Sequence, residues 1–145
     1  MKKAFFAYLF LSVLPISVSA EVSGKKTSAA CGEITEGEFT NSKEVHSYSI
    51  KLEPGDKVDF LSLPVGAYLR LQADLIEPTG QVIESITGAR GQKMELKSKT
   101  LSGRGSYSFI VRNHSRAHDH SGRAGMYELH VGCTKRNGTE IRPSS

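Results

Sequence analysis

The sequence offers few features that point to catalysis, nucleic acid or a membrane. Its 145 residues include no tryptophan, two cysteines and a formal net charge of only +4. This charge is too small and too evenly spread for nucleic acid, which binds to a dense basic stripe. Beyond residue 14 no long apolar run occurs, so we expect no membrane anchor. The length suits one domain with one core.

The signatures of common enzyme classes are missing too. The chain has no G-x-S-x-G, no H-E-x-x-H, no P-loop and no G-x-G-x-x-G before a helix. Both cysteines are expected to be bonded to each other, which removes a thiol nucleophile. We therefore expect a protein that is not an enzyme and carries no cofactor.

Residues 1–20 are typical of a secretory signal peptide. Lys2 and Lys3 precede an apolar run over residues 4–14, and small residues lead to the expected cleavage site before Glu21. The run is only about half the roughly 20 residues that a membrane-spanning helix needs. We expect export to the bacterial periplasm. Loss of the two lysines leaves 17 basic and 15 acidic residues, a charge of about +2.

Cys31 and Cys133 lie near opposite ends of the mature chain. An oxidising compartment favours a disulfide between them. The alternative, a metal–thiolate pair, would need a C-x-x-C or a nearby histidine spacing that is absent. In the chain-entropy description, closing a loop of about 100 residues stabilises the fold by up to about 4.7 kcal/mol.

Alternation of apolar and polar residues predicts strands throughout the mature chain. The pattern occurs at 45–52, 58–60, 69–75, 82–86, 94–96, 107–111 and 127–133. Short strands with turns between them predict an all-β fold, an antiparallel β-sandwich of about eight strands with one disulfide. We expect the sandwich domain to span 31–133, after a flexible N-terminal segment, 21–30, and before a polar tail, 134–145.

One pattern occurs twice. Residues 105–111 and 125–131 both read G-x-Y-x-Φ-x-V, where Φ is Phe or Leu. The repeat predicts two neighbouring strands joined by the polar loop 112–124. Two copies are too few for a solenoid, which needs at least three.

The loop 112–124 contains the main candidates for a metal site: His114, His118, Asp119 and His120. In an extended backbone His118 and His120 share a face, and either of the other two side chains completes a zinc or copper site. Two nearby arginines would repel a cation, and no cysteine is free to assist. We therefore expect no metal and interpret the segment as a polar hairpin loop.

Residues 101–107 are the main candidate for a binding loop. Its glycines permit close approaches of the backbone, so a protruding loop can present a hydroxyl and a guanidinium to a partner's carboxylates. A glycosidase cleft offers two such carboxylates. Tyr107 matches Tyr127 in the repeated pattern, which leaves a core position and a partner contact both open for it. The candidate residues are Ser102, Gly103, Arg104, Gly105, Ser106 and Tyr107.

These features together resemble the bacterial periplasmic lysozyme inhibitors. The likeness is closest to the inhibitors of invertebrate-type (i-type) lysozyme, in which a short S-G-…-Y motif enters the lysozyme active site. Here the motif is 102–107, and the resemblance implies an inhibitor whose partner is a lysozyme. A mature charge of about +2 gains nothing by steering toward the strongly basic chicken-type lysozymes. An invertebrate-type target is therefore expected.

A second resemblance competes with the first. Residues 48–58, 77–80 and 105–107 are similar to the bacterial pre-peptidase C-terminal domains, sandwich modules appended to secreted proteases. This resemblance implies a binding module for polysaccharide or protein without inhibitory activity. Exposed strand edges also leave a homodimer open.

Overall fold

The computed structural model describes residues 24–66, 69–114 and 124–144, which form strands and the turns between them. The predicted signal peptide, 1–20, lies outside these residues. The strands are β1 (Gly24–Ser28), β2 (Ile34–Phe39), β3 (Val45–Leu52), β4 (Lys57–Val65), β5 (Leu71–Ile76), β6 (Val82–Thr87), β7 (Met94–Thr100), β8 (Gly105–Asn113), β9 (Gly125–Thr134) and β10 (Glu140–Ile141).

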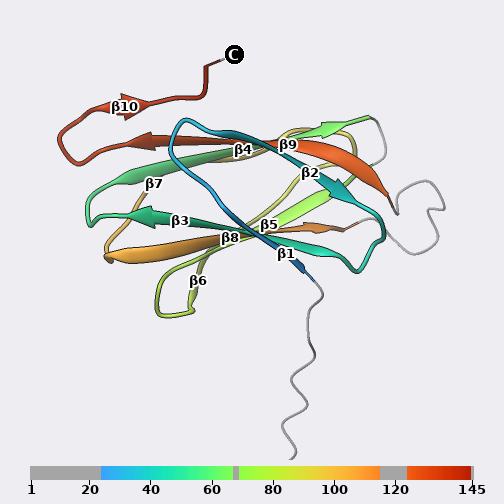
Figure 1. Cartoon of the computed structure of the whole chain (residues 1–145), viewed down its shortest axis with the longest axis horizontal. Helices are drawn as coiled ribbons and strands as arrows, with labels where there is room; N and C mark the ends of the chain where they lie inside the picture. The colour runs from blue at the N-terminus through green and yellow to red at the C-terminus, as the bar shows by residue number, and fades with distance from the viewer. Residues whose placement is uncertain (1–23, 67–68, 115–123, 145) are drawn as a thin grey trace, which may run out of the picture.

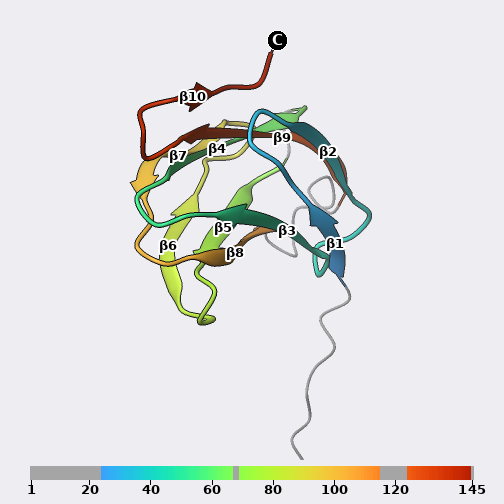
Figure 2. The ribbon, with the colours of Figure 1, turned by 60° about the vertical axis from the view of Figure 1, so that its left-hand side comes forward.

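Two sheets pack face to face (Figures 1 and 2). Sheet A has the order β1-β3-β8-β5-β6, and sheet B has the order β10-β9-β4-β7. β2 also pairs with β9, on the side away from β4. Every pairing is antiparallel except that of β1 with β3. The all-β sandwich predicted from the alternation is confirmed.

The core lies between the sheets and is built from the predicted faces of the strands. In β3 the side chains from His46 to Leu52 alternate between buried and more exposed positions, and β8 and β9 show the same alternation. Phe60 of sheet B stacks on Phe109 of sheet A, with ring centroids 4.0 Å apart. Full burial of one such side chain contributes about 1.5–3 kcal/mol. This pair therefore helps to hold the two layers together.

The chain passes from sheet A to sheet B between β1 and β2, and the disulfide secures this crossing. The Ala29 N–H donates to β3 (2.8 Å), whereas the Gly32 N–H donates to β9 (2.8 Å). Between them Cys31 is bonded to Cys133 of β9, with a Cα–Cα distance of 5.5 Å. The predicted disulfide is confirmed.

The structure differs from the sequence prediction at both ends of the domain. The sequence predicts a flexible segment over 21–30, whereas residues 24–28 form β1, which pairs in parallel with β3. Its sequence, GKKTS, has no apolar alternation from which a strand could be predicted. The strand is held at the edge of sheet A by its backbone pairing with β3. The predicted tail, 134–145, likewise contains β10, which pairs with the end of β9.

The two strands with the repeated pattern are not neighbours, contrary to the prediction. β8 lies in sheet A and β9 in sheet B. Tyr107 and Tyr127 are both fully buried between the layers. The repeat therefore reflects the same inward alternation in two strands of opposite sheets.

Candidate functional site

Three segments meet at one end of the sandwich: the turn 53–56, the connection 101–104 and the hairpin 135–139. They adjoin because the end of β3 pairs with the start of β8, and the start of β4 pairs with the end of β9. Together they line a shallow pocket of about 460 Å³. Its lining residues are Glu53, Pro54, Asp56, Arg104, Lys135, Arg136 and Asn137.

Asp56 connects all three segments. Its carboxylate accepts hydrogen bonds from Lys135 Nζ (3.0 Å), the Arg136 N–H (3.1 Å) and the Glu53 N–H (3.2 Å). Its carbonyl accepts from the Leu101 N–H at 2.9 Å. Asp56 is 2% exposed, and burial alone would raise the pKa of its carboxyl. The three hydrogen bonds outweigh burial and hold this pKa below its ordinary value.

Tyr107 shapes the connection 101–104 from beneath. Its hydroxyl donates to the Gly103 carbonyl (2.8 Å) and accepts from the Gly103 N–H (3.0 Å). Leu101 is buried in the core, and its carbonyl accepts from the Gly55 N–H at 2.8 Å. Because Tyr107 is fully buried, it positions the loop and does not reach a partner.

The other candidate positions differ in exposure. Ser102 and Ser106 are exposed, and the Arg104 side chain is 78% exposed. Arg104 Nε donates to a Glu53 carboxylate oxygen at 2.8 Å. Gly105 has φ +136°, and a Cβ there would lie 3.0 Å from a carbon of the Pro78 ring. The segment is thus a short, pinned connection from β7 to β8 that presents the exposed side chains of Ser102 and Arg104.

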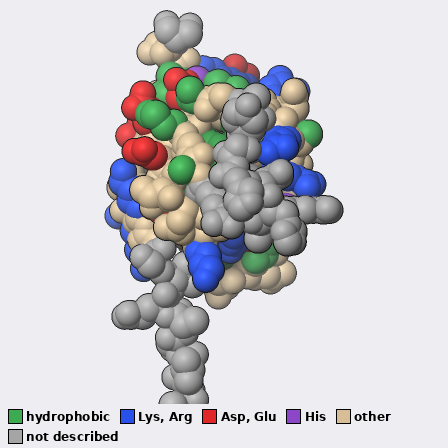
Figure 3. Space-filling view, turned by 90° about the vertical axis from the view of Figure 1, so that its right-hand side faces the viewer, with side chains coloured by type: hydrophobic (Ala, Val, Ile, Leu, Met, Phe, Trp, Pro, Cys, Tyr) green, Lys and Arg blue, Asp and Glu red, His purple; other side chains and the backbone are tan. Residues whose placement is uncertain are grey.

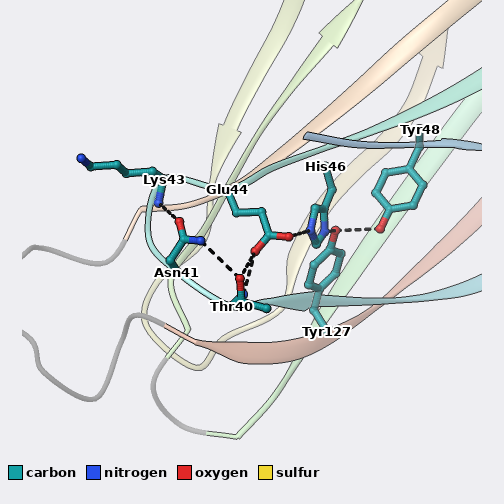
Figure 4. A network of polar contacts seen from close by, with 7 residues as sticks. All are labelled: Thr40, Asn41, Lys43, Glu44, His46, Tyr48 and Tyr127. Carbon is teal, nitrogen blue, oxygen red and sulfur yellow. Dashed lines mark hydrogen bonds and ion pairs between the residues drawn. The ribbon is translucent and has the colours of Figure 1, made fainter. Parts of the chain in front are cut away.

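A second group of polar side chains lies inside the sandwich (Figure 4). His46 is 1% exposed, and its Nδ1 lies 2.7 Å from the Tyr127 hydroxyl. Its Nε2 lies 3.3 Å from Glu44 Oε1, and the Tyr127 hydroxyl also bonds to that of Tyr48 (2.7 Å). The His46 ring stacks on Phe39 with centroids 4.4 Å apart. At the surface the chain of contacts continues through Thr40, Asn41 and Lys43.

The environment of this network stabilises neutral tyrosines and a charged glutamate. Burial, followed by the neighbouring Tyr48, raises the pKa of Tyr127, and burial also raises that of Tyr48. The N–H of Thr40 lowers the pKa of Glu44, against the smaller effect of burial. A histidine closed off from solvent cannot act on a substrate. We therefore assign the network to the structure of the domain.

This network was not predicted from the sequence. His46 falls on the apolar face of its strand, which was the available signal. Gly37 in β2 also belongs to this site, because a Cβ there would come within 2.3 Å of the Tyr127 ring. Only the fold reveals this contact, since the two residues meet through the pairing of β2 with β9.

The metal candidates are only partly covered by the structure. His114 is exposed, whereas His118, Asp119 and His120 lie outside the described residues. Within 24–66, 69–114 and 124–144, no group of three or more potential ligands could hold a metal ion. The same residues contain no helix long and apolar enough to cross a membrane.

Comparison with known proteins supports the fold. No protein-family model and no curated protein matches the sequence. Among solved structures, the pre-peptidase C-terminal domain of a Bacillus anthracis collagenase is 15% identical with a TM-score of 0.58; the similarity covers 74% of this chain and 94% of that one. PliG from Aeromonas hydrophila, a periplasmic inhibitor of g-type lysozyme, is 17% identical with a TM-score of 0.52. This similarity covers 76% of this chain and 98% of PliG.

At these identities the similarity shows a common sandwich fold. One neighbour is a lysozyme inhibitor and the other a pre-peptidase C-terminal domain, which agrees with both resemblances at the level of the fold. The inhibitor is named for g-type lysozyme, so the comparison does not support the invertebrate-type specificity. The candidate residues and the pocket coincide at the end of the sandwich formed by 53–56, 101–104 and 135–139, which we call the loop end.

Proposed function

We propose that this chain is a non-catalytic periplasmic protein that binds a lysozyme and blocks its active-site cleft with the connection 101–104. The observation that carries the proposal is the combination of a fully buried Tyr107 with a solvent-exposed Arg104 in the same short segment. A rigid backbone thereby presents a cation and the Ser102 hydroxyl at one end of a stable body.

The chemistry suits a glycosidase cleft. Such clefts carry two carboxyl groups about 5–9.5 Å apart, flanking the scissile bond. The guanidinium of Arg104 can pair with a carboxylate through two parallel N–H donors, and the Ser102 hydroxyl can donate to a second oxygen. The partner's cleft would then be occupied by groups that match its own catalytic acids.

Arg104 is available for such an exchange. Its present partner, Glu53, is 59% exposed, so the pair is solvated on both sides. Exposed ion pairs of this kind contribute only about 0–1 kcal/mol. Release of Arg104 from Glu53 therefore opposes binding only weakly.

The pinned backbone adds to affinity. Ordering a flexible loop on binding costs about 0.5–1.5 kcal/mol for each immobilised side chain. In this domain the two Tyr107–Gly103 hydrogen bonds and the buried Leu101 already fix the loop. A preorganised loop avoids much of the ordering cost.

The expected target is an invertebrate-type lysozyme, as the inhibitor resemblance and the mature charge favour. The structural neighbour PliG is named for a g-type lysozyme, so both types belong in the assay. The periplasmic location is supported by the disulfide and by the predicted signal peptide.

The test is a turbidity assay of bacterial cell-wall lysis by chicken-type, g-type and invertebrate-type lysozymes, with the purified mature chain added. We expect inhibition of one type with saturable, stoichiometric binding. Arg104→Ala should weaken inhibition about 10- to 100-fold, the effect of losing a hydrogen bond between charged groups. Lys97→Ala is the matched control, because Lys97 is 74% exposed and also paired with a surface glutamate. Unchanged lysis by all three types would refute the proposal.

The alternative function is that of a binding module for polysaccharide or protein. It is favoured by the similarity to the collagenase domain, which has the higher of the two TM-scores. This alternative predicts retention of the mature chain on an insoluble polysaccharide or protein matrix, no effect on lysis and no sensitivity to Arg104→Ala.

A further inference from the structure

The outer face of sheet B presents an ordered array of side chains away from the loop end. Three adjacent strands each contribute one column of three outward residues, and residues at the same height in neighbouring columns are register partners. β2 contributes Ile34, Glu36 and Glu38, β9 contributes His130, Glu128 and Met126, and β4 contributes Leu61, Leu63 and Val65. Outward positions of a sandwich are ordinarily polar, so the β4 column is unusual.

The apolar part of this array is open to solvent. Val65 is 57% exposed, and its register partner Met126 is 42% exposed. Ile34 is exposed as well, so three of the four large hydrophobic side chains exposed among the described residues lie on this face. Ile34 lies at the far end of the β2 column, in register with His130, so the adjacent exposed pair is Val65 and Met126. Adjacent exposed apolar side chains with a polar rim are typical of interaction surfaces.

The rim on the β2 side is acidic, whereas on the β7 side Glu95, the register partner of Leu61, is already paired with Lys93 (3.7 Å) and Lys97 (3.4 Å). Glu36 lies directly opposite Glu128, and Glu38 directly opposite Met126. Like charges at directly opposite positions repel and destabilise the strand pair. Glu128 contacts His130 (3.0 Å), but within the part of the chain that the structure describes neither Glu36 nor Glu38 forms an ion pair. A cation from outside would relieve this repulsion.

Figure 3 shows the resulting juxtaposition. Acidic side chains (red) gather beside hydrophobic ones (green) in the upper part of the view, the part where sheet B lies in Figure 1. With strands about 4.8 Å apart and same-face residues about 6.8 Å apart, the array measures about 10 by 14 Å. A helix with its side chains is about 10–12 Å across, so the array matches one amphipathic segment.

We infer that this face, consisting of Glu36, Glu38, Glu128, Val65 and Met126, is a docking surface for a cationic amphipathic segment of another protein. Lysines or arginines of the segment would neutralise the carboxylates while its apolar side chains cover Val65 and Met126. An anionic lipid surface does not fit, because the carboxylates would repel it.

The docking surface is separate from the loop that is proposed to enter a lysozyme. Val65 is the last residue of β4 and Asp56 directly precedes its first, so the two lie about 30 Å apart along the strand. The inference therefore does not depend on the proposed inhibitory function, and both surfaces can be occupied in one molecule.

The experiment measures the binding of a fluorescent lysine–leucine peptide with helical spacing to the mature chain, by anisotropy. The matched peptide with glutamate in place of lysine is the ligand control. We expect the cationic peptide to bind and the acidic one not to bind. The double variant Glu36→Gln/Glu38→Gln should weaken binding about tenfold, and Val65→Ser should weaken it several-fold.

The control double variant Glu77→Gln/Glu84→Gln has the same net charge but leaves the docking surface intact, so its binding should equal that of the parent chain. Absence of peptide binding, or equal weakening in both double variants, would overturn the inference. Sedimentation velocity tests whether a second copy of this chain occupies the face instead. Self-association of the parent chain that Val65→Ser abolishes would assign the face to a second copy and would also overturn it.

Discussion

The Asp56→Asn substitution tests whether one buried carboxylate holds the loop end together. The change keeps the size and shape of the side chain and removes its charge. The three hydrogen bonds that its carboxylate accepts, from Lys135, the Arg136 N–H and the Glu53 N–H, become weaker or are lost. Hydrogen bonds to charged groups contribute about 1.5–3 kcal/mol, against about 1 kcal/mol for neutral ones. We therefore expect a loss of about 2–3 kcal/mol in the free energy of unfolding at neutral pH.

The pH dependence supplies a second, independent readout. The hydrogen bonds hold the pKa of Asp56 below its value in the unfolded chain, which is about 3.9. A group with a lowered folded-state pKa stabilises the protein above the unfolded pKa, and this contribution is lost as the pH falls through the folded pKa. The difference between parent and Asp56→Asn should be constant near neutral pH and should shrink below about pH 4.

Urea unfolding followed by far-UV circular dichroism measures both quantities, since the chain has no tryptophan to report on unfolding. Glu53→Gln is the control, because its carboxylate is exposed on the same turn, and we expect a change below about 0.5 kcal/mol. A loss for Asp56→Asn as small as that of the control, or one that does not change from neutral to acid pH, would refute the role assigned to Asp56.

Three further changes test the loop, the buried network and the crossing. Tyr107→Phe removes both hydrogen bonds to Gly103 and should lower stability by about 1 kcal/mol while weakening lysozyme inhibition, with unchanged inhibition contradicting the positioning role. Gly37→Ala forces a Cβ against the Tyr127 ring and should lower stability by about 1–3 kcal/mol in thermal unfolding, whereas Glu36→Ala on the same strand should change little. Reduction of the disulfide should lower stability by about 2–5 kcal/mol, and equal urea midpoints with and without reductant would contradict the stabilising role of this cross-link.

The alternation of apolar residues was sufficient to predict the sandwich, because burial on one face imposes a period of two wherever a strand borders the core. It predicted the inward faces of β3, β8 and β9 and the burial of Cys133. It could not predict β1, whose five residues are held by hydrogen bonds to the edge of β3 and bury no apolar face. Strands fixed by backbone pairing alone leave little trace in the sequence.

The candidate site was predictable in its residue types and not in its contacts. The serine, glycines and arginine of 102–105 marked the loop, but its shape depends on Tyr107, whose core position the repeated pattern left open. Asp56 carried no signal of its own in the sequence, because it lies between two predicted strands, 45–52 and 58–60. Its partner Lys135 is 79 residues away, and pairs so distant come together only through the tertiary fold.

The disulfide at the crossing between the sheets also governs how the domain responds to mechanical force. Tension applied to the two ends of the chain would reach Cys31 from one side and Cys133 from the other, and would then pass through the sulfur–sulfur bond. Among the strands that the structure describes, β1 and β10 alone lie outside that covalent bridge. Pulling would therefore detach β1 from β3 and β10 from β9, and the cross-link would then prevent extension of the chain between the two cysteines.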